Sequence, residues 1–328
     1  MPSRGLKCAF AGAASTVCGK SGCLQHQELM ILREAGSGYG NFRTFAPMIA
    51  YTLNCRGRLV SLSKPMVMGI LNLTPDSFYA ESRMQSEAEI RERIRQMKAE
   101  GADMVDVGAY SSRPGADDVS FQEEALRLRC GMKIVREEWP DVPVSIDTFR
   151  ADVAKLAVEE LGADIINDIS GGELDKQMFP TVARLGVPYV LMHMKGTPAN
   201  MQQAPEYEDV GREVMLYLAE RLDCLHSMGA KDIIVDPGFG FGKTLAHNYE
   251  LFARMEDFHA LGRPLLVGVS RKSMVYRLLD GTPQTALNGT TVLHTVALLK
   301  GAHILRVHDV REAVEVREVV MKILSSYD

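Results

Sequence analysis

Polar and charged residues recur in this sequence directly after short apolar runs, and their types suggest two kinds of chemistry. The first group consists of hydrogen-bond acceptors: Asp106, Asp147, Asn167 and Asp236. Buried acceptors of this kind bind rings with an amidine-like edge, because a carboxylate accepts two parallel hydrogen bonds from it. Pterins and guanines carry such an edge. The group therefore predicts a pocket for a nitrogen-rich heterocycle.

The second group supplies positive charge. Its members are Arg271, Lys272, Arg306 and His308, and such side chains are suited to phosphate oxygens. Asn72, after the first apolar run, offers a neutral oxygen, and Mg²⁺ commonly takes one or two protein oxygens in addition to phosphate oxygens. Together the two groups predict a ligand in which a heterocycle is joined to a phosphate or diphosphate.

A glycine-rich segment, residues 238–244, looks like a phosphate loop but fits neither common pattern. A Walker A motif would need glycine where Pro237 stands, and the third glycine of the dinucleotide pattern, Gly242, comes one residue early. We interpret the glycines as letting the backbone pass close to a flat ligand. Phe239 or Phe241 either stacks on that ligand or belongs to the core. A serine hydrolase is disfavoured because no G-x-S-x-G sequence occurs.

The elements that must position these residues follow a regular alternation. Apolar runs with few polar interruptions are typical of parallel strands buried on both faces. Eight such runs occur, at residues 67–71, 104–107, 142–146, 164–166, 188–192, 232–235, 264–269 and 302–307. Helical periodicity lies between and after them, most clearly at residues 86–100, 150–161 and 311–324. The pattern predicts an α/β fold, a (β/α)8 TIM barrel, with a doubly wound sheet as the alternative.

The chain before the barrel differs in composition. Two strand-like segments flank Cys55-Arg56-Gly57 and predict a short β-hairpin. Residues 1–46 hold five basic and two acidic residues and lack the apolar core of a signal peptide. We expect them to form a flexible extension or to precede a true start near Met48, with a transit peptide as the alternative. Residues 47–328 are expected to form the barrel domain.

Composition excludes several classes of protein. The 328 residues carry a net charge of −5, which disfavours nucleic-acid binding. No apolar stretch approaches the ~18–20 residues of a membrane span. Six cysteines lack C-x-x-C spacing, and Cys18, Cys23 and His26 make a poor zinc site. We expect a cytoplasmic protein without nucleic-acid or membrane partners.

Five segments resemble, in order, the signatures of the dihydropteroate synthase family. They are residues 68–78 (MGILNLTPDSF), 112–116 (SRPGA), 236–244 (DPGFGFGKT), 270–273 (SRKS) and 306–309 (RVHD). The resemblance covers about residues 50–325 and implies a transferase of folate biosynthesis. Its reaction joins p-aminobenzoate to 6-hydroxymethyl-7,8-dihydropterin diphosphate, releasing diphosphate and 7,8-dihydropteroate. It also implies Mg²⁺ as cofactor, a homodimer, and inhibition by sulfonamides.

The resemblance assigns roles to individual residues. The pterin would be held by Asp147, Asn167, Met192, Asp236 and Lys272. The diphosphate would be held by Asn72, Arg113, Arg306 and His308, with Mg²⁺ at Asn72. The p-aminobenzoate pocket would be bordered by Ser111, Ser112, Arg113, Pro114, Phe241, Lys272 and Ser273, with Phe78 on a covering loop. We expect Asp147, Lys272, Arg306 and His308 to catalyse by positioning and electrostatics, since an aniline is already neutral at pH 7.

Two stretches depart from the family pattern. Phe78 is followed by Tyr-Ala-Glu-Ser where the family often has Ser-Asp-Gly-Gly, and Glu81 is the candidate replacement for the missing acid. Ser112 stands where the family usually has threonine. Because this position borders the pocket that sulfonamides share, we predict altered drug contact with substrate binding retained. Unchanged sulfonamide affinity in Ser112→Thr would contradict this prediction.

Two other functions remain as alternatives. A methyltetrahydrofolate-type methyltransferase barrel would share the pterin pocket, but it needs no diphosphate site, so the motifs at 270–273 and 306–309 argue against it. A catalytically silent pterin-binding paralogue is supported by the altered first loop alone, because Asn72 and His308 are both present. The closing helix, residues 311–324, has enough apolar residues for both a core and a dimer interface.

Overall fold

The computed structural model describes residues 49–73, 83–110, 119–197, 201 and 205–326, all within the unit Arg43–Asp328. The predictions made for residues 1–46, for Phe78 and Glu81, and for residues 111–114 lie outside this described part. Four of the predicted site residues are therefore not placed: Ser111, Ser112, Arg113 and Pro114.

Eight parallel strands form the centre of the fold. In chain order they are β3 (Met66–Asn72), β4 (Met104–Gly108), β5 (Val144–Asp147), β6 (Ile165–Asp168), β7 (Tyr189–Met192), β8 (Ile233–Asp236), β9 (Leu266–Val267) and β10 (Ile304–Val307). Neighbours in the sheet follow the order β8-β7-β6-β5-β4-β3-β10-β9. A parallel bridge from Val235 to Leu265 links β8 to the segment of β9, so the barrel is nearly closed. The TIM-barrel prediction is confirmed, and the doubly wound sheet is not what forms.

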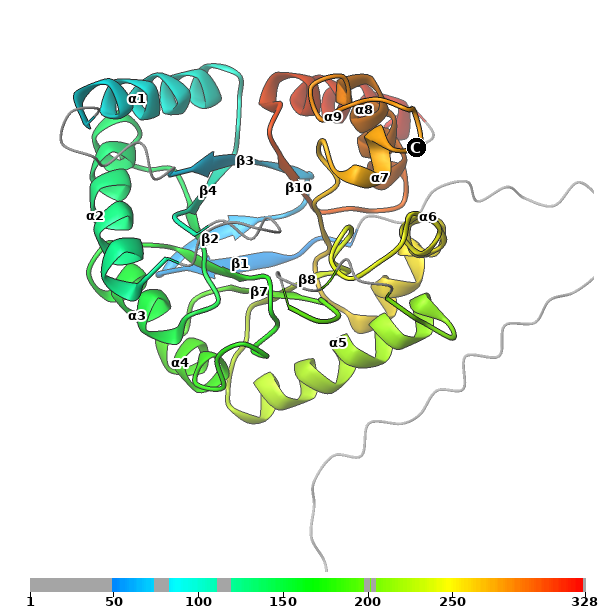
Figure 1. Ribbon diagram of the computed structural model, residues 1–328, viewed down its shortest axis with the longest axis horizontal. Helices are drawn as coiled ribbons and strands as arrows, with labels where there is room; N and C mark the ends of the chain where they lie inside the picture. The colour runs from blue at the N-terminus through cyan, green and yellow to red at the C-terminus, as the bar shows by residue number, and fades with distance from the viewer. Residues whose placement is uncertain (1–48, 74–82, 111–118, 198–200, 202–204, 327–328) are drawn as a thin grey trace, which may run out of the picture. The chain divides into compact units, whose positions relative to one another are not determined.

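Helices surround these strands as a ring (Figure 1). They are α1 (Arg83–Ala99), α2 (Phe121–Glu138), α3 (Ala151–Glu159), α4 (Met178–Leu185), α5 (Val210–Ser227), α6 (Leu245–Ala253), the 3-10 helix η2 (Met255–Leu261), α7 (Ser273–Tyr276), α8 (Leu287–Leu299) and α9 (Val310–Leu324). The three helices predicted from periodicity correspond to α1, α3 and α9. Within the described residues, none of the helices has the length and apolar character needed to cross a membrane.

The predicted hairpin is also confirmed, and it closes one end of the barrel. Strands β1 (Thr52–Cys55) and β2 (Arg58–Ser61) pair antiparallel around a turn at Arg56 and Gly57. Leu53 and Leu62 are buried in one apolar cluster with residues near the amino ends of the barrel strands. The strand members of that cluster are Met68, Met104, Ile165, Val190, Ile234, Leu266 and Ile304.

Strand alternation explains why the other end is polar. Successive side chains of a strand point to opposite faces, so the residue two positions further along faces the barrel interior again. Two positions beyond the apolar layer stand Asp106, Asn167, Met192, Asp236 and Arg306. The interior is therefore apolar where the hairpin covers it and polar toward the carboxyl ends of the strands, where barrel enzymes place their sites.

Candidate active site

Arg306 on β10 lies between two carboxylates at the polar end of the barrel. Its Nε donates to Oδ2 of Asp106 over 2.6 Å, and its Nη2 donates to Oδ2 of Asp147 over 2.7 Å. Burial alone would lower the pKa of Arg306, but the two carboxylates outweigh it and the pKa lies above its usual range. Arg306 is therefore a permanent cation whose remaining N–H groups are available to a ligand.

Asp106 is the deepest acid of the site, with no exposed surface. Besides Arg306 it accepts a hydrogen bond from Nδ2 of Asn167 over 3.2 Å. This bond turns the Asn167 carbonyl oxygen away from Asp106. Oδ1 of Asp106 is buried without a hydrogen-bond partner in the described residues. Because a buried unpaired carboxylate oxygen is costly, this atom marks a place where a hydrogen-bond donor is missing.

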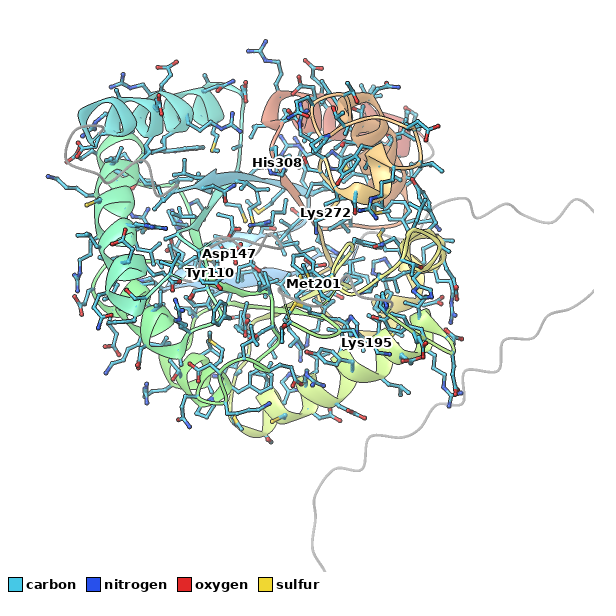
Figure 2. All side chains as sticks on the ribbon, in the orientation of Figure 1. Tyr110, Asp147, Lys195, Met201, Lys272 and His308 are labelled. Carbon is cyan, nitrogen blue, oxygen red and sulfur yellow. The ribbon has the colours of Figure 1, made fainter. Side chains whose placement is uncertain are left out.

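Asp147 ends β5 on the same side of the barrel and is about one-fifth exposed. Burial raises its pKa to about 7, with Arg306 opposing this shift and Asp106 adding to it. A carboxyl group with this pKa changes charge near neutral pH. Figure 2 shows Asp147, Lys272 and His308 within the ring of helices.

Asp236 and Lys272 form the other charged part of the site. Oδ1 of Asp236 accepts from the backbone N–H of Gly238 over 2.7 Å, and burial raises the pKa of Asp236 although Lys272 opposes it. Nζ of Lys272 donates to the carbonyl of Phe239 over 2.6 Å and lies 4.5 Å from the centre of the Phe241 ring. Burial lowers the pKa of Lys272 to about 8.

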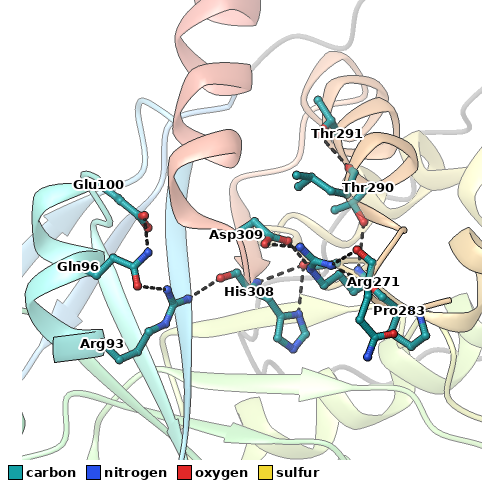
Figure 3. Close-up of polar contacts among 12 residues, drawn as sticks. Arg93, Gln96, Glu100, Arg271, Pro283, Thr290, Thr291, His308 and Asp309 are labelled. Atoms are coloured by element: carbon teal, nitrogen blue, oxygen red, sulfur yellow. Dashed lines mark hydrogen bonds and ion pairs between the residues drawn. The ribbon is translucent and has the colours of Figure 1, made fainter. Parts of the chain in front are cut away.

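His308 follows β10 and is held from two sides (Figure 3). Its backbone N–H donates to Oγ of Ser270 over 3.1 Å, and its Nδ1 lies 3.1 Å from the same oxygen. Arg93 of α1 donates to its carbonyl. Burial first, and then Arg306, lowers the pKa of His308 to about 4, so the imidazole is neutral at pH 7.

Arg271 has a different role from the phosphate contact that its residue type suggested. Its guanidinium pairs with both carboxylate oxygens of Asp309, each at 2.8 Å, and donates to the carbonyls of Pro283 and Gln284 (Figure 3). These bonds hold Arg271 at a left-handed φ of 53°. The residue ties together the loops after β9 and β10, so we do not count it among the phosphate ligands.

An apolar wall completes the pocket, and the two phenylalanines of the glycine-rich segment differ in their relation to it. Phe239 is fully buried and packs edge-on against Phe252, with 5.4 Å between the ring centres, so it belongs to the core. Phe241 is partly exposed and packs against a separate cluster made of Ile169, Met192, Met194 and Met201. Phe241 therefore faces the site, as does Met192, the residue expected to contact the ring of the ligand.

The glycines of residues 238–242 serve a purpose in addition to the predicted one. A Cβ on Gly238 would lie 1.8 Å from the carbonyl oxygen of His193, and one on Gly242 would lie 2.2 Å from that of Lys195. The close approach is therefore to the chain after β7, and not only to a flat ligand. Both glycines also have positive φ, 71° and 62°, where a side chain is strained.

Asn72 and Ser273 stand at the edge of this site. Gly108 leaves space between Asn72 and Asp147, because a Cβ there would lie 3.6 Å from both Oδ1 of Asn72 and Cβ of Asp147. A single amide oxygen suits a Mg²⁺ ion whose other ligands are phosphates and water. No group of three His, Cys, Asp or Glu side chains that could hold a metal occurs in the described ranges. A cavity of about 200 Å³ lies beside Ser273.

Three residues near the site were not among those predicted. Ser270 orients His308, Met201 adds to the apolar wall, and Lys243 forms a buried contact with His193. Ser270 and Lys243 lie inside the quoted motifs, so the motifs contained the signal. Met201 is separated from β7 in the chain and carries no sequence signal of its own.

Comparison with known proteins places this arrangement in a family. The family model described as pterin binding enzyme matches residues 68–308. Dihydropteroate synthase of Escherichia coli (strain K12) is 42% identical over 276 residues, which are 84% of this chain and 97% of the relative.

Solved structures give the same result. The structure of Yersinia pestis dihydropteroate synthase with a sulfonamide drug complex has a TM-score of 0.76 and 38% identity, and the match covers 84% of this chain and 100% of that one. Xanthomonas albilineans dihydropteroate synthase with 4-aminobenzoic acid has a TM-score of 0.77 and 36% identity, and the match covers 84% of this chain and 99% of that one. By its motifs, its barrel and its site, the chain belongs to the dihydropteroate synthase family of pterin-binding enzymes.

Proposed function

We propose that this protein carries out the reaction of its family, joining 6-hydroxymethyl-7,8-dihydropterin diphosphate to p-aminobenzoate in folate biosynthesis. The nitrogen of p-aminobenzoate attacks the methylene carbon of the pterin. A carbon–nitrogen bond forms as the carbon–oxygen bond to diphosphate breaks, and the aniline loses one proton to water. The observation that carries this proposal is the inward-facing polar layer, in which Asp106, Asn167, Asp236 and Arg306 lie at the same level of the barrel.

The acceptors of that layer fit a pterin. Asp236 and Asp147 are carboxylates able to accept the N–H groups of an aminopyrimidinone edge. Asn167 presents its carbonyl oxygen, because its amide nitrogen is bonded to Asp106. Lys272 can donate to the ring carbonyl, and Met192 and Phe241 offer apolar surface. This assignment predicts binding of the pterin part without the diphosphate, but more weakly.

The leaving group is to be stabilised by positive charge and hydrogen-bond donors. Arg306 keeps its charge at every working pH, and His308 offers a neutral ring N–H. Preorganised donors aimed at developing negative charge contribute about 3–4 kcal/mol each to transition-state stabilisation. We therefore assign Asp147, Lys272, Arg306 and His308 the main catalytic work, without a covalent intermediate.

We propose Mg²⁺ as the cofactor, held by Asn72 together with substrate phosphates and water. When bound, it would neutralise diphosphate charge as the bond to carbon breaks. Asn72→Ala should raise the Mg²⁺ concentration required for half-maximal rate, whereas Asn72→Asp should lower it. Equal metal requirement in both variants would remove Asn72 from the metal site.

We place p-aminobenzoate against Phe241 and Ser273, and expect sulfonamides to compete with it there. The support is that the Xanthomonas albilineans relative is described with 4-aminobenzoic acid and the Yersinia pestis relative with a sulfonamide drug. Competitive inhibition against p-aminobenzoate, and not against the pterin, is the expected kinetic pattern.

The deciding experiment follows dihydropteroate and diphosphate release from purified protein given both substrates, with and without Mg²⁺. Product that requires both substrates and the metal is the expected result. Pterin binding without product would support the silent paralogue instead. Absence of pterin binding would overturn the assignment of the whole site.

We further propose a homodimer in the cytoplasm. The support for a dimer is an apolar surface on α8 and α9, where Val292, Val319 and Ile323 are 55%, 61% and 44% exposed. Val319→Glu should convert the dimer to a monomer in sedimentation, whereas Leu216→Glu on α5 should not. Free Cys55, Cys130 and Cys224 are consistent with a reducing compartment.

A further inference from the structure

Two lysines hold the turn that carries Phe241, and only one of them belongs to the site described above. In the turn, the N–H of Phe241 donates to the carbonyl of Gly238 over 3.1 Å. Lys272 donates to the carbonyl of Phe239 from the side of the pocket. Lys243 donates to the carbonyls of Gly238 and Phe241, over 2.8 and 3.2 Å. Three carbonyls of one turn, those of Gly238, Phe239 and Phe241, are thus bound by two lysine amines.

Lys243 is almost completely buried, 3% exposed, and its third contact is with His193 at the end of β7. Its Nζ lies 2.9 Å from Nδ1 of His193. Burial, followed by the charge of Lys243, lowers the pKa of His193 to about 2, so the imidazole is neutral. Burial also lowers the pKa of Lys243. Both the ammonium and the neutral amine carry enough N–H groups to donate to two carbonyls.

The Nζ of Lys243 is used by carbonyls of the turn and by an imidazole, so we assign it no contact with substrate. The turn connects it to two side chains that do face the site. Phe241 is part of the turn, and Lys272 is bonded to Phe239 and lies over the Phe241 ring at 4.5 Å. Loss of the Lys243 amine leaves the carbonyl of Phe241 and the imidazole nitrogen of His193 without this partner, and leaves the carbonyl of Gly238 with the N–H of Phe241. Buried polar groups that lose a partner are costly, so the turn is expected to move.

We infer that Lys243 is a positioning residue for the second substrate, holding the Gly238–Phe241 turn so that Phe241 and Lys272 border the p-aminobenzoate pocket. This inference rests on the proposed function. The pterin residues Asp147 and Asn167 stand on β5 and β6 and have no bond to the turn, whereas Asp236 and Lys272 are bonded to it at Gly238 and Phe239. Lys243 therefore affects the binding of p-aminobenzoate more strongly than the binding of the pterin.

The test replaces Lys243 with methionine, which has a similar length and no donor. In Lys243→Met, KM for p-aminobenzoate should rise about tenfold, because misplacing a binding surface by about 1 Å has effects of that order or larger. The dissociation constant for the pterin, measured by calorimetry without p-aminobenzoate, should change less than about threefold. A KM that stays at the wild-type value overturns the inference.

A double-mutant cycle separates positioning from general destabilisation. Because Lys243 is inferred to act through both Phe241 and Lys272, Lys243→Met added to Phe241→Ala should raise KM by a smaller factor than it does in the wild-type protein. The same factor in both backgrounds would contradict a route through Phe241. If Lys243→Met does not fold, Lys243→Gln retains one donor and takes its place, with a smaller rise in KM expected.

Arg317→Met provides a matched control for the loss of a buried cation. Arg317 is 6% exposed on α9, bonded to Asp103 and to the carbonyl of Pro65 at the far end of the strands. Its replacement should lower thermal stability and leave KM unchanged. Failure of this inference is distinguishable from failure of the proposed function, because the latter requires that the wild-type protein itself makes no product.

Discussion

The guanidinium of Arg306 is the group on which the other charges of the site depend. It bonds Asp106 beneath it and Asp147 beside it, and Asp106 also sets the orientation of the Asn167 amide. A ligand that binds to Arg306 therefore changes the electrostatic surroundings of Asp147 as well. Removing one partner of such a buried pair is costly, because the other is left uncompensated.

Asp106→Asn tests this dependence. The asparagine keeps the shape but removes the charge opposite Arg306, and its own amide competes with that of Asn167. We expect kcat/KM for the pterin substrate to fall about 100-fold. Asp168→Asn is the matched control: Asp168 is equally buried but bonds Ser170, Gly172 and Tyr189. It should lower stability and leave kcat/KM close to wild type; an equal loss in both variants would show that burial alone matters.

The pH dependence follows from Asp147 and Lys272. With a pKa of about 7, Asp147 is protonated below neutrality and accepts fewer hydrogen bonds from a pterin. With a pKa of about 8, Lys272 loses its proton and charge above that pH. We expect kcat/KM for the pterin substrate to be bell-shaped, falling below about pH 7 and above about pH 8. In Asp147→Asn the acid limb should disappear; if it persists, another group, or the substrate, causes it. His308 does not contribute, since its pKa is about 4.

At the scale of elements, the loops after β7, β8 and β9 support one another. The loop after β8 lies against the backbone of the loop after β7 at Gly238 and Gly242, and Lys272 from the loop after β9 bonds its carbonyl at Phe239. Loops packed backbone to backbone hold their side chains more firmly than loops in contact with solvent alone. This packing explains how a loop side chain such as that of Phe241 is held in place.

Gly238→Ala and Gly186→Ala separate close approach from backbone strain. Both glycines have similar positive φ, 71° and 64°. A Cβ at 238 would collide with the carbonyl of His193, whereas a Cβ at 186, after α4, meets nothing within 4 Å. Gly186→Ala should lower the free energy of unfolding by about 1 kcal/mol, and Gly238→Ala by more than about 3 kcal/mol. Urea denaturation measures both, and similar values would mean that the loop moves freely.

At the scale of the whole barrel, stability and chemistry lie at opposite ends. The hairpin β1–β2 covers an apolar layer at the amino ends of the strands, and the charged residues stand at the carboxyl ends. Barrel enzymes generally show this division. Substitutions at the two ends should therefore have separable effects.

Leu53→Ala in the hairpin tests the separation. Leu53 is 2% exposed, so its truncation should lower the free energy of unfolding by about 2–5 kcal/mol. Leu59 on β2 is 72% exposed, and Leu59→Ala should change the free energy of unfolding by less than about 0.5 kcal/mol. Both variants should keep wild-type kcat/KM when assayed well below their melting temperatures. Lost activity in folded Leu53→Ala would show that the hairpin also shapes the site.

The sequence by itself determined the eight strands, the hairpin and the family of the site. Buried strands leave apolar runs, and site residues remain within motifs that the chain carries locally. Asn167, Asp236 and Arg306 could be found for this reason. The signals were local, so they needed no knowledge of which strands are neighbours.

Only the tertiary structure decided which of two similar residues faces the ligand. Asp147 faces the site while Asp168 does not, because Asp147 pairs with Asn167 and a shift of one residue along a strand reverses the face. Phe241 packs against the methionine cluster of the site while Phe239 packs in the core against Phe252, and this difference is made by the turn between them. Arg271 is bound by Asp309, 38 residues away, and Lys243 by His193, 50 residues away. Contacts at such separations exist only once the barrel has closed, and no local pattern encodes them.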